Sequence, residues 1–164
     1  MTQTNRLFKL VRATSKFPKG IRSTLWSKAF GRVVPMVGTA NIRYLEVDAD
    51  HVKVRLENQR NVQNHIKGVH AAAMALLAET ATGFLVGLHI PDERIILIKS
   101  LHVDYLKVAQ GGLTATATLS ADQQKFILAN EKGEMLIPVT VIDDSGNEPI
   151  HCQMLWAWLP KRKK

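Results

Sequence analysis

Three polar side chains stand out because they flank or interrupt one long apolar stretch, residues 64–89. Asn64, His70 and Glu79 are of the types that position, polarise or deprotonate a substrate. Glu79 lies among small and apolar residues, and a carboxylate is rarely buried there without a partner or a purpose. Loss of hydration raises the pKa of such a carboxyl group and makes it a better base. Together these residues predict acyl transfer or hydrolysis.

The element that must carry them is a helix from about Val69 to Leu88. It is apolar on almost every side, which predicts a buried helix. The N–H groups of residues 69–72 open this helix and lack partners within it. With the positive end of the helix dipole they form a site for developing negative charge, as an oxyanion hole requires. We expect Gly68 and Val69, at this end, to contact the substrate.

His70 and Glu79 do not converge within one chain. Nine residues of helix separate them by about 13.5 Å along the axis and turn them by roughly 180°. If they cooperate, they come from different subunits. Two such helices packed antiparallel about a two-fold axis would bring the N-terminus of one helix beside the middle of the other. The sequence therefore predicts a homodimer with two composite sites, with a dimer of dimers as an alternative.

The rest of the chain is predominantly strand, because after Ala40 apolar residues alternate with polar ones. Strands are expected at residues 42–47, 52–56, 94–107, 113–120, 135–142 and 149–159, and short helices at 5–16, 21–30 and 122–130. Pro138 predicts a bulge or a sheet edge. A sheet that curls around the central helix would bury its whole circumference, which predicts one α+β domain. We divide it into a basic helical segment (1–39), a core (40–159) and a basic tail (160–164).

The stretch NHIKGVHAAAMALLAE, from Asn64 to Glu79, resembles the signature of hotdog-fold acyl-CoA thioesterases of the phenylacetate (PaaI-like) type. Tyr105–Ala109 is similar to that family's Tyr-x-x-Pro-Ala. The resemblance covers about residues 40–159, and the basic N-terminal helices resemble those of an uncharacterised subgroup. It implies a hotdog fold, in which a curved antiparallel sheet wraps a long central helix, and an active site shared by two subunits.

Carried over by position, the resemblance implies a role for each residue of the motif. Glu79 would activate water or attack the thioester carbonyl, and the N–H of Ala71 would hold the oxyanion. His70 would polarise or orient the carbonyl, and Asn64 would position the water or the thioester. The alternatives are ordinary structural roles: a surface or salt-bridged glutamate, a histidine at a helix end and a loop-capping asparagine.

The sequence departs from the family pattern in three places. Ala71 replaces a glycine, Val108 replaces a proline, and Ile98 stands where a Ser or Thr often supports the acid. Lys99 or Ser100 could substitute if the strand is bulged, so Lys99 is a further candidate for substrate binding. These changes favour a second interpretation, a non-catalytic acyl- or lipid-binding hotdog protein. The longer His-to-Glu spacing of hotdog dehydratases is not found.

The charge is strongly positive, with a net value of +8 and a pI near 9.8, and the first acidic residue is Glu46. This favours anionic partners, among them the phosphates of coenzyme A. The N-terminal helices could lie on a membrane, cap the sheet or belong to an organelle transit peptide. No nucleic-acid partner is expected, because no basic motif with interleaved aromatic residues is found.

Cysteine and histidine usage gives no sign of a metal or a resident cofactor. Cys152 is the only cysteine, so it can form neither an internal disulfide nor a cysteine-based zinc site. The remaining histidines lack metal-ligand spacing. Coenzyme A is expected only as part of the substrate, and a reducing, cytoplasmic location without a secretory signal is the expectation.

Overall fold

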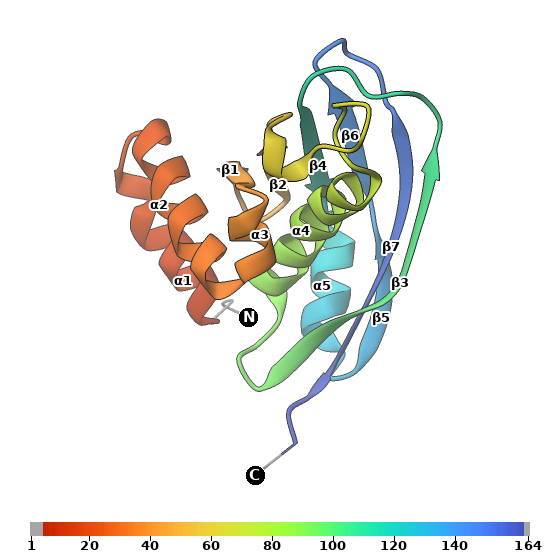
Figure 1. The fold of residues 1–164 in the computed structure, drawn as a ribbon. Helices are drawn as coiled ribbons and strands as arrows, with labels where there is room; N and C mark the ends of the chain where they lie inside the picture. Colours follow the sequence, from red (N-terminus) through yellow and green to blue (C-terminus); the bar gives the residue numbers. More distant parts are fainter. Residues whose placement is uncertain (1–4, 163–164) are drawn as a thin grey trace.

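The central helix, α4 (Ala71–His89), lies between a curved antiparallel sheet and a layer of N-terminal helices (Figure 1). The computed structural model describes residues 5–162 of the chain. The strands are β1 (Arg43–Val47), β2 (His51–Leu56), β3 (Arg94–Tyr105), β4 (Leu113–Thr118), β5 (Gly133–Ile137), β6 (Val139–Asp143) and β7 (Ile150–Pro160). The other helices are α1 (Arg6–Ala13), η1 (Thr14–Lys16), α2 (Lys19–Val33), α3 (Pro35–Thr39), η2 (Arg60–Val62) and α5 (Ala121–Ala129).

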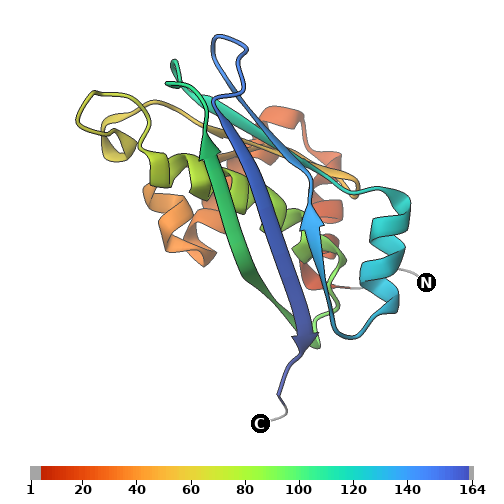
Figure 2. The ribbon, with the colours of Figure 1, turned by 90° about the vertical axis from the view of Figure 1, so that its right-hand side faces the viewer.

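The sheet has two halves that meet at Pro138. One half has the order β1-β2-β4-β6 and the other β3-β7-β5, all antiparallel. Only Pro138 separates β5 from β6, so a single stretch of chain leaves one half and joins the other. Proline cannot donate to a strand ladder, and the sequence predicted a bulge or a sheet edge here. In the structure, Pro138 lies in the break between β5, which pairs with β7, and β6, which pairs with β4. Figure 2 shows β3, β7 and β5 side by side, with α4 behind them in this view.

The two edge strands of this sheet differ in how they are covered. Helix α2 packs along β1, where the Tyr44 N–H donates to the Ser27 hydroxyl at 3.0 Å. No described element pairs with the free side of β3, although it is 12 residues long. Its side chains Leu97 and Leu101 are 53% and 45% exposed. A long, apolar, unpaired edge is the part of a sheet most ready to pair with another chain.

Helix α4 is fixed to the sheet by close packing and one buried hydrogen bond. The Trp156 indole N–H donates to the Thr82 hydroxyl at 2.9 Å. A Cβ atom at Gly83 would lie 2.5 Å from the Trp156 ring, so this glycine permits the contact. The helix is apolar and long enough for a membrane span by length and composition, but it forms the core of the domain.

The expectation that the sheet would bury the whole circumference of this helix is wrong. Ala72 is exposed, and Ala75, Leu76 and Glu79 are only half-buried. The sheet ends at β3 before it can close around this side of α4. One face of the first half of the helix therefore remains uncovered in the single chain.

The N-terminal segment is anchored to α4 through a buried side chain. Asn5 caps α1, where its Oδ1 accepts from the Phe8 N–H at 2.7 Å. Its amide group donates to the carbonyl oxygens of Gly87, Leu88 and Ile90 at 2.7–2.9 Å. These acceptors lie at the end of α4, where helix carbonyls lack internal partners. The segment 5–39 thus packs on the core, and it includes one helix, α3, that the sequence did not predict.

Candidate active site

The start of α4 is held in place by His70. This residue is the N-cap, and its Nδ1 accepts a hydrogen bond from the Ala72 N–H at 3.1 Å. An imidazole nitrogen that accepts carries no proton, so the neutral ring bears its proton on Nε2. The His70 backbone N–H donates to the Val62 carbonyl at 2.8 Å. His70 can therefore cap its helix and still offer one ring N–H to a ligand.

One backbone donor at this end is unused. The N–H groups of Ala73 and Met74 bond to the His70 carbonyl. The Ala71 N–H has no hydrogen-bond partner among residues 5–162, and Ala71 is exposed. The Ala71 carbonyl, in contrast, accepts from the Tyr105 hydroxyl at 2.9 Å. Ala71, the first residue of the helix, is thus braced through its carbonyl, while its N–H stays open, as a donor to an oxyanion should be.

Asn64 organises the loop before the helix. Its Oδ1 accepts from the N–H groups of Ile66 and Gly68, both at 3.0 Å, and its backbone N–H bonds to the Gly68 carbonyl. The Asn64 NH₂ group makes no hydrogen bond to a described residue, so it is the part left to meet a ligand. Val69 is 1% exposed, which leaves it and Gly68 only backbone groups with which to contact a substrate.

Glu79 is half-buried on the uncovered face of α4. Among the described residues, its carboxylate forms neither a hydrogen bond nor an ion pair. Desolvation raises its pKa above the ordinary value of a glutamate. The pKa of Tyr44 is raised as well, first by burial and second by the negative charge of Glu79. Glu79 is therefore neither the salt-bridged nor the fully solvated residue of the alternative interpretation.

These groups lie on one helix but at different levels. His70 and Ala71 stand at its first residues, and Glu79 follows about 13 Å further along the axis. One thioester carbonyl therefore cannot lie within hydrogen-bond distance of both the Ala71 N–H and the Glu79 carboxylate of the same chain. The structure brings Asn64, Gly68 and His70 together around the loop and leaves Glu79 apart.

Strand β3 is bulged where the sequence analysis allowed for it. The register of β3 against β7 shifts between Ile98 and Ser100. Lys99 forms an ion pair with Glu134 of β5, whose neighbour Met135 packs on the core, so the pair lies on the face of the sheet away from α4. Lys99 therefore does not reach Glu79 of its own chain. The Ser100 hydroxyl makes no hydrogen bond to a described residue.

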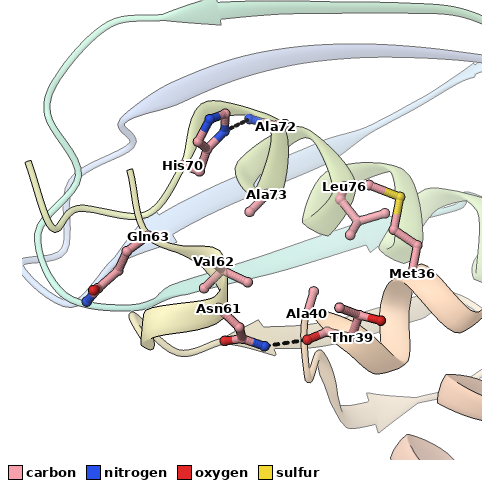
Figure 3. Close-up of a pocket in the computed structure, with 10 residues that line it drawn as sticks. All are labelled: Met36, Thr39, Ala40, Asn61, Val62, Gln63, His70, Ala72, Ala73 and Leu76. Carbon is pink, nitrogen blue, oxygen red and sulfur yellow. Dashed lines mark hydrogen bonds between the residues drawn. The ribbon is translucent and has the colours of Figure 1, made fainter. Parts of the chain in front are cut away.

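A cavity of about 220 Å³ opens beside the start of α4 (Figure 3). Its wall is mostly apolar: Met36 and Ala40 from the α3 region, Val62 from η2, and Ala73 and Leu76 from α4. The sequence analysis missed Met36 and Leu76 as site residues. The signal for Leu76 was present, since it follows His70 on the same helix, but nothing local marks Met36.

The part of the chain that the structure describes places no cluster of metal ligands beside these residues. Within residues 5–162, no group of three His, Cys, Asp or Glu side chains is placed to hold a metal ion. The donors of the site are one ring N–H, one backbone N–H, one amide and one carboxylate. Such a set can polarise a carbonyl and transfer a proton without a further group.

Residues 22–159 match a family model described as a domain of unknown function, DUF4442. The chain belongs to this family. The match begins within α2 and extends through the end of β7, so DUF4442 includes the whole sheet and α4. No curated protein matches the sequence.

Solved structures place this member of DUF4442 among hotdog folds. A Pseudomonas aeruginosa protein described as a probable thioesterase is 18% identical, with a TM-score of 0.75 and coverage of 88% of this chain and 97% of its own. A thioesterase family protein from Silicibacter pomeroyi is 13% identical (TM-score 0.67, 85% and 99% covered). A Haemophilus influenzae thioesterase is 13% identical (TM-score 0.64, 96% and 92% covered). The expected hotdog fold is confirmed.

Proposed function

We propose that the protein hydrolyses the thioester of an acyl-CoA at a site formed between two subunits. The observation that carries this proposal is the half-buried, unpaired carboxylate of Glu79 on a face of α4 that its own sheet leaves uncovered. The Ala71 N–H, unpartnered at the start of the same helix, supplies the complementary group. A base and an oxyanion donor are the two parts that thioester hydrolysis needs.

The dimer follows from the edges of the sheet. Because α2 occupies the β1 edge and nothing described occupies β3, a second copy would pair through β3. Two β3 strands related by a two-fold axis run antiparallel, which joins two sheets into one. Such a pairing would set the uncovered faces of the two α4 helices against each other. Glu79 of one subunit would then face Ala71 of the other.

In the proposed reaction, Glu79 takes a proton from a water molecule, and the oxygen of that water attacks the thioester carbonyl carbon. In the alternative route, the Glu79 carboxylate attacks that carbon to form an acyl-enzyme anhydride, and water then hydrolyses the anhydride, which restores the carboxylate and supplies the proton for the thiolate. The carbonyl oxygen becomes an oxyanion that accepts from the partner's Ala71 N–H, with the His70 Nε2–H as a second donor. Collapse of this intermediate breaks the carbon–sulfur bond, and the leaving thiolate takes up the proton. The raised pKa of Glu79 suits the base to this task.

Binding of the two ends of the substrate is supported by different features. The apolar cavity at Met36 and Leu76 suits a short acyl segment, since it is smaller than the roughly 300 Å³ at which ligand pockets usually begin. The net charge of +8 suits the phosphates of coenzyme A. Neighbouring solved structures described as thioesterases support the same chemistry.

The test is release of free thiol from a panel of acyl-CoAs of increasing chain length. The wild-type protein should release thiol in repeated turnovers, and Glu79→Gln should reduce kcat by at least about 100-fold, as the loss of a general base does. Glu131→Gln, which changes an exposed glutamate between α5 and β5, is the matched control and should act like wild type. Equal release by Glu79→Gln and wild type would exclude the proposed mechanism.

A second candidate is binding of an acyl group without turnover. It is favoured by Ala71, whose Cβ narrows the approach to the N–H, and by Ile98, which cannot donate to the acid. This candidate predicts saturable binding of acyl-CoA with no thiol release from any member of the panel. Wild-type turnover would exclude it.

A further inference from the structure

A second cavity lies outside the candidate active site, between α1, α2 and the turn after β1. It has a volume of about 190 Å³, and the side chains of Arg12, Arg22, Ser15 and Asp48 line it together with the Trp26 ring. The only carboxylate among them, Asp48, accepts from the Ala49 N–H at 2.8 Å. The cavity wall therefore carries two guanidinium groups and one carboxylate already engaged in a turn.

Arg22 carries an unsatisfied donor at this cavity. Its Nε is buried and makes no hydrogen bond among the described residues, and its guanidinium lies 5.6 Å from the centre of the Trp26 ring. A buried charged donor without an acceptor is costly. Guanidinium groups bind phosphate through paired N–H groups, so a phosphate that accepts from Arg22 would compensate the charge of this guanidinium. The cavity is thus suited to a phosphate group that enters from outside.

The outer side of α2 next to this cavity is apolar as well as basic. Phe17, Ile21 and Leu25 are 49%, 50% and 44% exposed, whereas Trp26 and Phe30 of the same helix are buried against the core. We call the three exposed side chains, with the adjacent Lys16 and Lys19, the α2 outer face. No acidic residue precedes Glu46, so nothing in this segment offsets the positive charge.

The α2 outer face would remain free in the proposed dimer. Helices α1 and α2 lie on the opposite side of α4 from β3 (Figure 1), so pairing through β3 does not bring them against the partner's β3. The cavity is also held rigid, because the Trp26 indole N–H donates to the Thr14 hydroxyl at 2.9 Å and so ties α2 to the end of α1.

We infer that the α2 outer face is a docking surface for an anionic phospholipid bilayer, with the arginine cavity receiving a lipid phosphate. Exposed apolar side chains beside lysines on a helix that lies flat on its domain are the pattern of an interfacial membrane contact. A second copy of the same face would be repelled by its charge. A nucleic acid would bind the basic groups through its phosphates, but its binding would not explain the exposed apolar side chains of Ile21 and Leu25.

Co-sedimentation with lipid vesicles tests this inference in the full-length protein. At 150 mM salt, the protein should bind vesicles of three parts phosphatidylcholine to one part phosphatidylglycerol and not vesicles of phosphatidylcholine alone. Phe17→Ser with Ile21→Ser should weaken binding by roughly tenfold or more, since burial of each apolar side chain in the bilayer contributes favourable free energy to binding. Lys16→Glu with Lys19→Glu should weaken binding to a similar extent, because the attraction of each basic group to the anionic surface contributes to binding. Arg22→Gln should weaken binding about fivefold.

Matched variants separate this surface from general attraction of a basic protein. Leu136→Ser changes a side chain that is 53% exposed on β5, and Lys125→Glu with Lys132→Glu makes the same charge change near α5. Both should bind vesicles as wild type does, and all variants should keep the wild-type melting temperature. Equal loss in the control variants would overturn the inference. So would equal binding to both kinds of vesicle, or retention of DNA but not of vesicles through Lys16 and Lys19.

Discussion

The Tyr105 hydroxyl donates a hydrogen bond of 2.9 Å to the backbone carbonyl of Ala71. This bond joins β3, the open edge of the sheet, to the first residue of α4, where the oxyanion donor is proposed. The Ala71 N–H belongs to the same residue, so its direction depends on this brace. In the proposed mechanism, Tyr105 is thus a positioning residue that joins the proposed dimer edge to the proposed oxyanion donor.

Replacement of Tyr105 by Phe removes this brace without removing its ring. We expect kcat for thioester hydrolysis to fall about five- to tenfold with little change in KM, since one hydrogen bond contributes about 1 kcal/mol. Tyr105 is 50% exposed, so the loss in stability should stay below about 1 kcal/mol. A change in KM alone, with kcat intact, would contradict a positioning role. Steady-state kinetics measure kcat and KM, and thermal melting measures the loss in stability.

Glu79→Gln should make the protein more stable at neutral pH. Desolvation raises the folded-state pKa of Glu79 above its unfolded value, so the stability it contributes is present below the unfolded pKa and lost as pH rises through the folded pKa. Glutamine carries no charge to desolvate. We expect a gain on the order of 1 kcal/mol at pH 7–8, about 2–4 °C in Tm, and none near pH 4. The same gain at both pH values would mean that burial of this charge is not the cause.

Gly83 and Gly87 form a matched pair on α4. A Cβ at Gly83 would lie 2.5 Å from the Trp156 ring, whereas one at Gly87 would lie 3.4 Å from the flexible end of Leu7. Gly83→Ala should therefore cost about 1–3 kcal/mol through overpacking. Gly87→Ala should be neutral or stabilise by up to about 1 kcal/mol, because alanine favours the helix. Chemical denaturation distinguishes the two, and equal effects would argue against the packing role of Gly83.

His89 should make the fold sensitive to mild acid. It is buried, and its Nε2 lies 2.6 Å from the Ala49 carbonyl oxygen. Burial lowers its pKa below the ordinary value, although the bond to Ala49 opposes this. The unfolded chain then binds more protons, so stability is complete above about pH 6.5 and declines as pH falls towards the folded pKa.

Unfolding free energies measured between pH 5 and 7 check this expectation. His89→Gln should reduce the slope of stability against pH, and His65→Gln, which changes an exposed loop histidine, should leave it unchanged. A slope that persists in His89→Gln would assign the acid sensitivity to another group.

Local patterns predicted most of the fold. Alternation along Leu113–Thr118 and Leu101–Tyr105 predicted strands, and Pro138 predicted a bulge or a sheet edge at the position where the chain passes from β5 to β6. The short helix α3 escaped prediction because its five residues include Gly38 and follow Val33 and Val34, which favour strands. Its importance lies in tertiary contacts, since Met36 reaches the cavity beside α4.

Parts of the site depended on contacts that spacing does not reveal. The motif located His70 and Glu79, but not that Glu79 would be left unpaired on an uncovered face, because that depends on where the sheet stops. A bulge near Lys99 entered only as a condition for Lys99 or Ser100 to substitute for a missing hydroxyl, and the ion pair of Lys99 with Glu134, two strands away, was not predicted. Asn5 was predicted only as the start of a short helix, and nothing in the sequence indicated that it donates to three carbonyls at the end of α4, more than 80 positions away.

The composite site itself can be tested with two inactive variants. Glu79→Gln lacks the base, and Ala71→Pro lacks the N–H. Proline suits the first position of a helix, and His70, with ψ of 140°, has the backbone conformation that a following proline requires. The two variants should therefore fold while each alone is inactive.

The decisive measurement is the thioesterase activity of an equal mixture of these two variants, unfolded and refolded together. In a mixed dimer, Glu79 of the Ala71→Pro chain faces the intact Ala71 N–H of the Glu79→Gln chain, so one of two sites is complete. Since half of the dimers are mixed, a site shared between subunits predicts recovery of about a quarter of wild-type activity. A mixture that stays as inactive as its components would contradict the shared site.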